Sequence, residues 1–166
     1  EGTEGDTILF TAANTSTGWD GIQIYNPSTS NDSCLFSYCR FEYAKRVPSN
    51  YQLSGGAISV RSVQKIRVTN NRFINNQATG SYGYGGAMSI MYSYNYNTIK
   101  KFNHNIFENN LGNVGIININ YSDIDFANNV LYNNTSTSGP TLRLSYTGGT
   151  YINNLISNNS GSYGGA

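Results

Sequence analysis

The most constraining feature of this sequence is a segment that recurs four times and carries two asparagines five positions apart. In every copy an apolar residue stands two positions after the first asparagine. The copies are IRVTNNRFINN (66–76), KKFNHNIFENN (100–110), IDFANNVLYNN (124–134) and GTYINNLISNN (149–159), and CLFSYCRFEYA (34–44) keeps the apolar pattern without the asparagines. Internal repeats of this length are typical of solenoids, in which each repeat stacks on the previous one.

A second block precedes each copy and alternates apolar with polar residues. The blocks are WDGIQI (19–24), GGAISV (55–60), GGAMSI (85–90), VGIINI (114–119) and GPTLRL (139–144). A period of two residues indicates half-buried strands. We expect the following side chains to face the interior: Ile58, Val60, Met88, Ile90, Ile117, Ile119, Leu142 and Leu144.

Each repeat therefore holds three short strands joined by short turns, and it is too small to bury its apolar residues alone. Stacked repeats about 4.8 Å apart would let each strand pair with its copies above and below. Charged residues make up only 11% of the chain, which disfavours long exposed helices. The sequence predicts an all-β fold, a right-handed single-stranded parallel β-helix of about five turns with three short strands per turn, forming one segment over residues 1–166.

The paired asparagines predict two internal ladders. In a solenoid each set falls in one column at a bend, where an amide can bond the amide of the next turn and cap free backbone groups. The predicted ladder residues are Asn71, Asn76, Asn105, Asn110, Asn129, Asn134, Asn154 and Asn159. The alternative interpretation is that these amides bind a glycan or an ion.

Tyrosines are concentrated in two of the longer connections and are the candidate binding residues. They are Tyr82, Tyr84, Tyr92, Tyr94 and Tyr96. An exposed aromatic cluster can stack on sugar rings or pack against a partner protein. The alternative is that the rings pack against the wall of the solenoid.

Several partner classes are disfavoured by composition. The formal net charge of +1 comes from scattered cations, which argues against nucleic acid as a partner. No apolar run approaches the roughly 20 residues of a membrane span. Cys34 and Cys39 form no metal-binding motif, so we expect no metal and no cofactor. Their separation in extended chain favours two free thiols.

The GGAI block paired with FINN, and GGAM paired with FENN, resemble the GGA(I/L/V) and FxxN repeats of the polymorphic outer-membrane protein family. The opening DTILFTAANTSTGWDGIQIYN (6–26) is similar to β-helix segments of large secreted bacterial surface proteins. The resemblance implies a secreted or cell-surface bacterial protein with a structural or adhesive role. It assigns no catalytic residues to this sequence.

An enzyme is the main alternative, because pectate lyases and polygalacturonases share the β-helix fold. Such polysaccharide lyases and hydrolases need clustered carboxylates on adjacent turns. Glu42 and Glu108 share a column, but Ile74 stands between them, which puts the carboxylates about 10 Å apart at ~4.8 Å per turn. We therefore expect no catalysis in this segment, with a pectin-lyase-like enzyme or a glycan-binding module as alternatives.

The two ends of the sequence both read as parts of turns. Gly164 to Ala166 repeat the glycine corner at Gly55 to Ala57, and Asp6 to Phe10 read as a strand of an earlier turn. Unpaired strand edges recruit other strands. We expect this segment to be interior to a longer β-helix, or to have as partners same-type turns of other copies stacked end to end.

Overall fold

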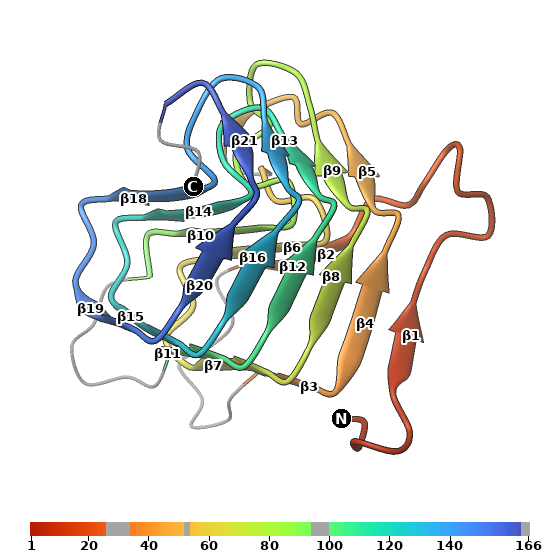
Figure 1. Cartoon of the computed structure of the whole chain (residues 1–166), viewed down its shortest axis with the longest axis vertical. Helices are drawn as coiled ribbons and strands as arrows, with labels where there is room; N and C mark the ends of the chain where they lie inside the picture. The colour runs from red at the N-terminus through yellow and green to blue at the C-terminus, as the bar shows by residue number, and fades with distance from the viewer. Residues whose placement is uncertain (26–33, 52–53, 94–99, 164–166) are drawn as a thin grey trace.

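The chain forms a parallel β-solenoid of about five turns, in which four sheets run along the length of the molecule (Figure 1). The computed structural model describes residues 1–25, 34–51, 54–93 and 100–163. All strand pairs between named strands are parallel, and each strand pairs with its equivalent in the neighbouring turn. Within the described residues no helix is long and apolar enough to cross a membrane.

We number the sheets in the order in which one turn of the chain passes through them. Sheet I contains β2 (Ile22–Tyr25), β6 (Ile58–Arg61), β10 (Met88–Met91), β14 (Ile117–Asn120) and β18 (Leu142–Ser145). Sheet II contains β3 (Cys34–Ser37), β7 (Ile66–Thr69), β11 (Lys100–Asn103), β15 (Ile124–Ala127) and β19 (Gly149–Ile152). Sheet III contains β1 (Ile8–Phe10), β4 (Cys39–Glu42), β8 (Arg72–Ile74), β12 (Ile106–Glu108), β16 (Val130–Tyr132) and β20 (Leu155–Ser157). Sheet IV contains β5 (Lys45–Arg46), β9 (Gln77–Ala78), β13 (Leu111–Gly112), β17 (Thr135–Ser136) and β21 (Ser160–Gly161).

The prediction of three strands per turn is wrong, because sheet IV supplies a fourth. Each of its strands is only two residues long and begins directly after the last residue of the repeated segment, as Gln77–Ala78 follows Asn76. A strand of two residues shows no alternation of apolar and polar side chains. The sequence therefore gives it the pattern of a turn.

The core runs through the centre of the solenoid and is built from columns of matching side chains. Ile58, Met88 and Ile117 are register partners in sheet I and are fully buried, as predicted. Val60, Ile90 and Ile119 form the next inward column and are equally buried. Leu142 is partly buried and Leu144 is 43% exposed, because β18 is the outermost strand of sheet I.

Aromatic rings fill the interior behind sheet III. Phe41, Phe73 and Phe107 stack face to face, with ring centroids 4.9 and 4.7 Å apart. Leu131 and Ile156 continue the same column in the last two turns. Stacking of this kind follows from the register, since identical residues on successive turns lie one strand spacing apart.

The corner between sheets IV and I requires glycine. A Cβ atom on Gly56 would lie 1.9 Å from the carbonyl oxygen of Gly86, and one on Gly86 would lie 2.4 Å from that of Leu111. Gly85 also has a φ angle of 81°, in the left-handed region that favours glycine. The GGA blocks are thus explained by close backbone approach between turns.

Candidate functional site

The first predicted asparagine ladder lies at the corner between sheets II and III. Asn105 donates from its side-chain amide to Oδ1 of Asn129 at 3.0 Å and to the carbonyl oxygen of Val68 at 2.8 Å. Its own Oδ1 accepts hydrogen bonds from the backbone and side-chain amides of Asn71, both at 3.1 Å. Asn154 extends the ladder by accepting from Asn129. Every amide in the ladder is thus engaged in holding adjacent turns together.

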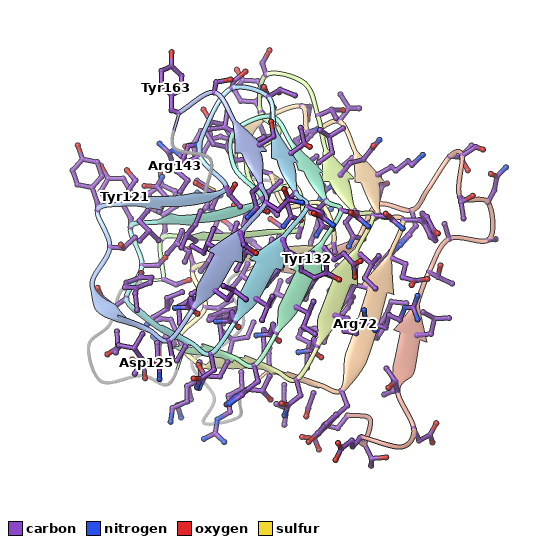
Figure 2. All side chains as sticks on the ribbon, viewed as in Figure 1. Arg72, Tyr121, Asp125, Tyr132, Arg143 and Tyr163 are labelled. Carbon is purple, nitrogen blue, oxygen red and sulfur yellow. The ribbon has the colours of Figure 1, made fainter. Side chains whose placement is uncertain are left out.

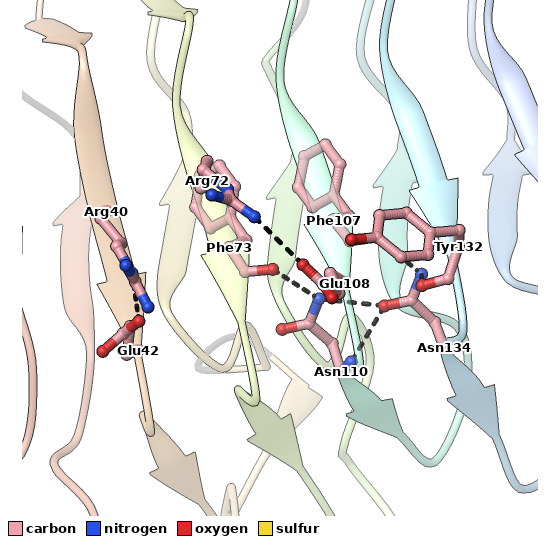
Figure 3. Close-up of polar contacts among 9 residues, drawn as sticks. All are labelled: Arg40, Glu42, Arg72, Phe73, Phe107, Glu108, Asn110, Tyr132 and Asn134. Atoms are coloured by element: carbon pink, nitrogen blue, oxygen red, sulfur yellow. Dashed lines mark hydrogen bonds and ion pairs between the residues drawn. The ribbon is translucent and has the colours of Figure 1, made fainter.

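The second ladder repeats this arrangement at the corner between sheets III and IV. Asn110 donates to Oδ1 of Asn134 at 3.0 Å and to the carbonyl oxygen of Phe73 at 2.9 Å (Figure 3). Asn76 and Asn159 continue the ladder in the preceding and following turns. The prediction of two internal asparagine ladders is confirmed. The side-chain amides hydrogen-bond one another and the backbone at the bends between strands.

A third ladder, made of serine, lies at the corner between sheets I and II. The repeat pattern did not predict it. Ser93 accepts a hydrogen bond on Oγ from the backbone amide of Val63 at 3.1 Å. Its own backbone amide donates to Oγ of Ser122 at 3.0 Å. Both serines are buried. The signal in the sequence is a Tyr-Ser pair directly after a strand of sheet I, in Tyr92-Ser93 and Tyr121-Ser122.

The two cysteines are free thiols, as expected. Cys34 is the register partner of Ile66, and the backbone amide of Cys39 donates to Oδ1 of Asn71 at 2.8 Å. Cys39 thus occupies the place of a ladder asparagine in its turn. Its burial raises the pKa of the thiol.

The predicted tyrosines are divided between two corners of the solenoid. Tyr82 and Tyr84 follow β9 at the corner between sheets IV and I, and Tyr92 follows β10 at the corner between sheets I and II. Tyr82 is exposed, whereas Tyr84 and Tyr92 are partly buried. Tyr94 and Tyr96 lie outside the described residues. The single five-residue patch therefore stays a prediction.

Tyr92 instead belongs to a stack that runs along the solenoid, which we call the tyrosine ladder: Tyr92, Tyr121 and Tyr146. The ring centroids are 5.5 Å apart between Tyr92 and Tyr121 and 4.6 Å apart between Tyr121 and Tyr146, with ring planes within 7°. Each ring follows a strand of sheet I and has a positive φ, which turns the side chain outward at the bend. Tyr146 is 76% exposed.

A cation extends the tyrosine ladder toward the first turn. The guanidinium carbon of Arg61 lies 5.5 Å from the ring centroid of Tyr92 and 5.1 Å from that of Tyr25. Cation–π contacts of this geometry stabilise both partners. One edge of sheet I therefore presents a row of aromatic rings interrupted by one arginine. Figure 2 shows Tyr121 projecting from this edge, on another side of the solenoid from Tyr132 and Arg72.

A pocket of about 120 Å³ opens on the outer face of sheet I, beside the tyrosine ladder. Its lining residues are Tyr51, Tyr84, Met91, Asn120 and Arg143. Met91 and Asn120 are register partners and directly precede Tyr92 and Tyr121. Burial raises the pKa of the Tyr92 hydroxyl, and a hydrogen bond with Tyr51 adds to the rise, which links the pocket to the ladder.

Polar side chains behind the pocket form a connected chain across the turns. Ser54 donates from Oγ to Oγ of Ser89 at 2.9 Å, and Asn118 donates to the same Ser89 atom at 3.0 Å. The Nη1 group of Arg143 donates to Oδ1 of Asn118 at 2.9 Å, and its guanidinium carbon lies 5.5 Å from the ring centroid of Tyr84. Since Ser54, Ser89 and Asn118 are fully buried, these bonds fix the position of Arg143.

The carboxylates considered for catalysis lie on the outer face of sheet III (Figure 3). Ile74 pairs with both Glu42 and Glu108, which confirms that it separates them. Glu42 is bonded to Arg40, and Glu108 lies 3.3 Å from Nη2 of Arg72 (Figure 3). A hydrogen bond to Glu108 raises the pKa of the Tyr132 hydroxyl. Among the described residues no group of three or more His, Cys, Asp or Glu side chains forms a metal-binding cluster.

The chain matches no family model, no curated protein and no solved structure.

Proposed function

We propose that this chain is a non-catalytic structural and adhesive module of a secreted or cell-surface protein, and that it contacts glycans through the outer face of sheet I. The observation that carries the proposal is the tyrosine ladder. Its three rings lie in a row on the outside of the solenoid, from the partly buried Tyr92 and Tyr121 to the exposed Tyr146, and tyrosine is enriched at binding surfaces.

The ladder suits a long polar partner. Tyr92, Tyr121 and Tyr146 stack face to face, so the edges of their rings form a row along the solenoid, and the ring of Tyr146 is mostly exposed. Their spacing follows the turns of the solenoid, so the same contact recurs with each turn. A glycan chain lying along the solenoid would meet an apolar edge and a hydroxyl group at each step.

The ladders inside the solenoid support a structural role. The asparagines and serines are bonded to the turns on either side, so the module is a rigid rod on which the outer face is held in place. The carboxylates of Glu42 and Glu108 each lie against an arginine, an arrangement that supports surface ion pairs over acid–base catalysis.

A glycan array tests the proposal. The parent chain should bind a subset of glycans, and the double variant Tyr121→Ser, Tyr146→Ser should lose most of that binding because the stacked edge is removed. Tyr132→Ser, on the outer face of sheet III, is the matched control and should bind as the parent does. Equal binding by parent and double variant, or no bound glycan at all, would refute the proposed function.

A further inference from the structure

We propose that the pocket on sheet I binds a carboxylate-bearing sugar ring, such as a uronic acid, within the glycan that the tyrosine ladder contacts. The inference rests on the proposed function and adds the ligand class. The pocket and the ladder are continuous, because Met91 and Asn120 line the pocket and their chain neighbours Tyr92 and Tyr121 form the ladder.

The charge of the pocket selects an anion. Arg143 contributes a guanidinium to the lining, and neither ion pair found among the described residues involves it. The five strands of sheet I carry Arg61 and Arg143 but no aspartate or glutamate. A guanidinium presents donors in a planar fork that matches a carboxylate. Its bond to Asn118 and its contact with Tyr84 hold the fork in one orientation.

Asn120, which lines the pocket together with Arg143, offers an acceptor for a sugar hydroxyl. Oδ1 of Asn120 is buried and has no hydrogen-bond partner among the described residues. A buried polar atom without a partner costs free energy, and a donor from a ligand would remove that cost. Sugars supply both groups at once, since a uronic acid carries hydroxyl donors on the same ring as its carboxylate.

The walls and the size of the pocket fit one ring. Tyr51 and Tyr84 supply aromatic surface for the apolar face of a sugar, and Met91, which is 4% exposed, adds apolar lining. The volume of about 120 Å³ lies well below the roughly 300–1,000 Å³ of sites that enclose a drug-sized ligand. The pocket therefore has room for no more than one sugar residue, and the rest of a chain would lie along the ladder.

Two monosaccharides test the ligand class in NMR titrations of the full chain. The probes are methyl glucuronoside and methyl glucoside, which carry a carboxylate and a hydroxymethyl group at the same ring position. Methyl glucuronoside should bind at least about tenfold more tightly, because a charge-assisted hydrogen bond to Arg143 is available to it alone. Shifted amide signals should include those of Tyr84 and Asn120.

Variants then assign the preference to the pocket. Arg143→Gln keeps a donor for Asn118 but removes the charge, and it should abolish the tenfold preference. Asn120→Asp is isosteric and places a negative charge in the pocket, so it should weaken the glucuronoside and spare the glucoside. Arg67→Gln, an exposed arginine in sheet II, is the matched control and should leave the preference intact. Thermal melts of all variants identify any that fail to fold.

The outcomes separate this inference from the proposed function. Equal affinity for the two probes, or a preference that survives in a folded Arg143→Gln or Asn120→Asp variant, overturns the uronic acid site. If the glycan array still reports binding that depends on Tyr121 and Tyr146, the adhesive function stands and only the ligand class fails. If the glucuronoside preference and the tyrosine-dependent binding on the array are both absent, the uronic acid site and the adhesive function are both overturned.

Discussion

The bend between β15 and β16 is made by two neighbouring asparagines with opposite environments. Asn128 is exposed and has a φ of 55°. Asn129 is fully buried, and its side chain is hydrogen-bonded to Asn105 in the preceding turn and to Asn154 in the following turn. Asparagine tolerates the left-handed conformation better than most residues with a Cβ atom. The same residue type is therefore used once for its backbone and once for its side chain.

Replacing Asn129 by alanine should destabilise the chain by about 1 to 3 kcal/mol, because buried groups lose their partners. The backbone amide of Asn105 would lose its acceptor, and the carbonyl oxygen of Phe102 would lose its donor. Urea denaturation measures the change in the free energy of unfolding. Thr150→Ala, an exposed change in β19, is the control and should alter it little. An Asn129→Ala chain as stable as the parent would contradict the structural role of the ladder.

Substitutions at Asn128 should separate backbone strain from side-chain bonding. Asn128→Val should cost about 1 to 2 kcal/mol, because a β-branched residue is strained at positive φ. Asn128→Gly should be close to neutral, since glycine adopts this conformation freely. The pair is compared by thermal melting. A valine variant that melts with the glycine variant would show that the bend relaxes at no cost.

At the scale of whole strands and corners, the glycine corners set how closely turns can approach. Gly86→Ala should destabilise the chain by about 2 kcal/mol or more, because the new methyl group would overlap a backbone carbonyl that cannot move without displacing β13. Gly5→Ala is the matched control, since a Cβ atom there meets nothing within 4 Å. Chemical denaturation of both variants checks the difference. Similar midpoints for the two would show that the corner between sheets IV and I adapts easily.

The elements that the sequence predicts well are those that repeat. Strands of sheets I, II and III were predicted because each recurs with the same alternation, and the two ladders because each asparagine recurs at one position. Lys100 could not be placed this way: it occupies an inward column of sheet II beside Ile66 and is 2% exposed, and desolvation lowers its pKa. A lysine in a core column contradicts the usual preference of its residue type, so pattern alone assigns it to the surface.

The pocket was also beyond prediction from sequence. Tyr51, Tyr84, Asn120 and Arg143 come from four separate stretches of the chain, and only the stacking of turns brings them together. Asn120 and Arg143 lie on neighbouring copies of the alternating strand but at different positions in it, so no recurring residue marks the pocket. The predicted tyrosine cluster includes Tyr84 and Tyr92, but grouping tyrosines by sequence did not anticipate the stacking of Tyr92 on Tyr121.

At the scale of the whole molecule, the outermost strands invite association. Within the described part of the chain β18, β19, β20 and β21 each pair on one side only, and Leu144, in an inward column of sheet I, is 43% exposed. We therefore expect residues 1–166 to self-associate as concentration rises, since open strand edges and exposed core side chains both favour stacking. Light scattering measures the apparent mass.

A charge at the open core column should weaken this association. Leu144→Lys should lower the apparent mass at a given concentration, whereas Thr150→Lys, in the same turn but on the outer face, should not. A parent chain that remains monomeric at every concentration tested would contradict end-to-end stacking.

The asparagine ladders have a direction, and this limits how copies could join. In both ladders every amide-to-amide hydrogen bond is donated toward the later turn, from Asn71 to Asn105 to Asn129 and from Asn76 to Asn110 to Asn134. The two ends of the ladders are chemically unlike, because the last turn carries Asn154 and Asn159 where the first turn has Cys39 and Ala44. Two copies related by a twofold axis would bring like faces together and interrupt the ladders. Copies that continue the hydrogen bonding must follow one another head to tail, an arrangement that does not close on itself and leads to filaments instead of dimers.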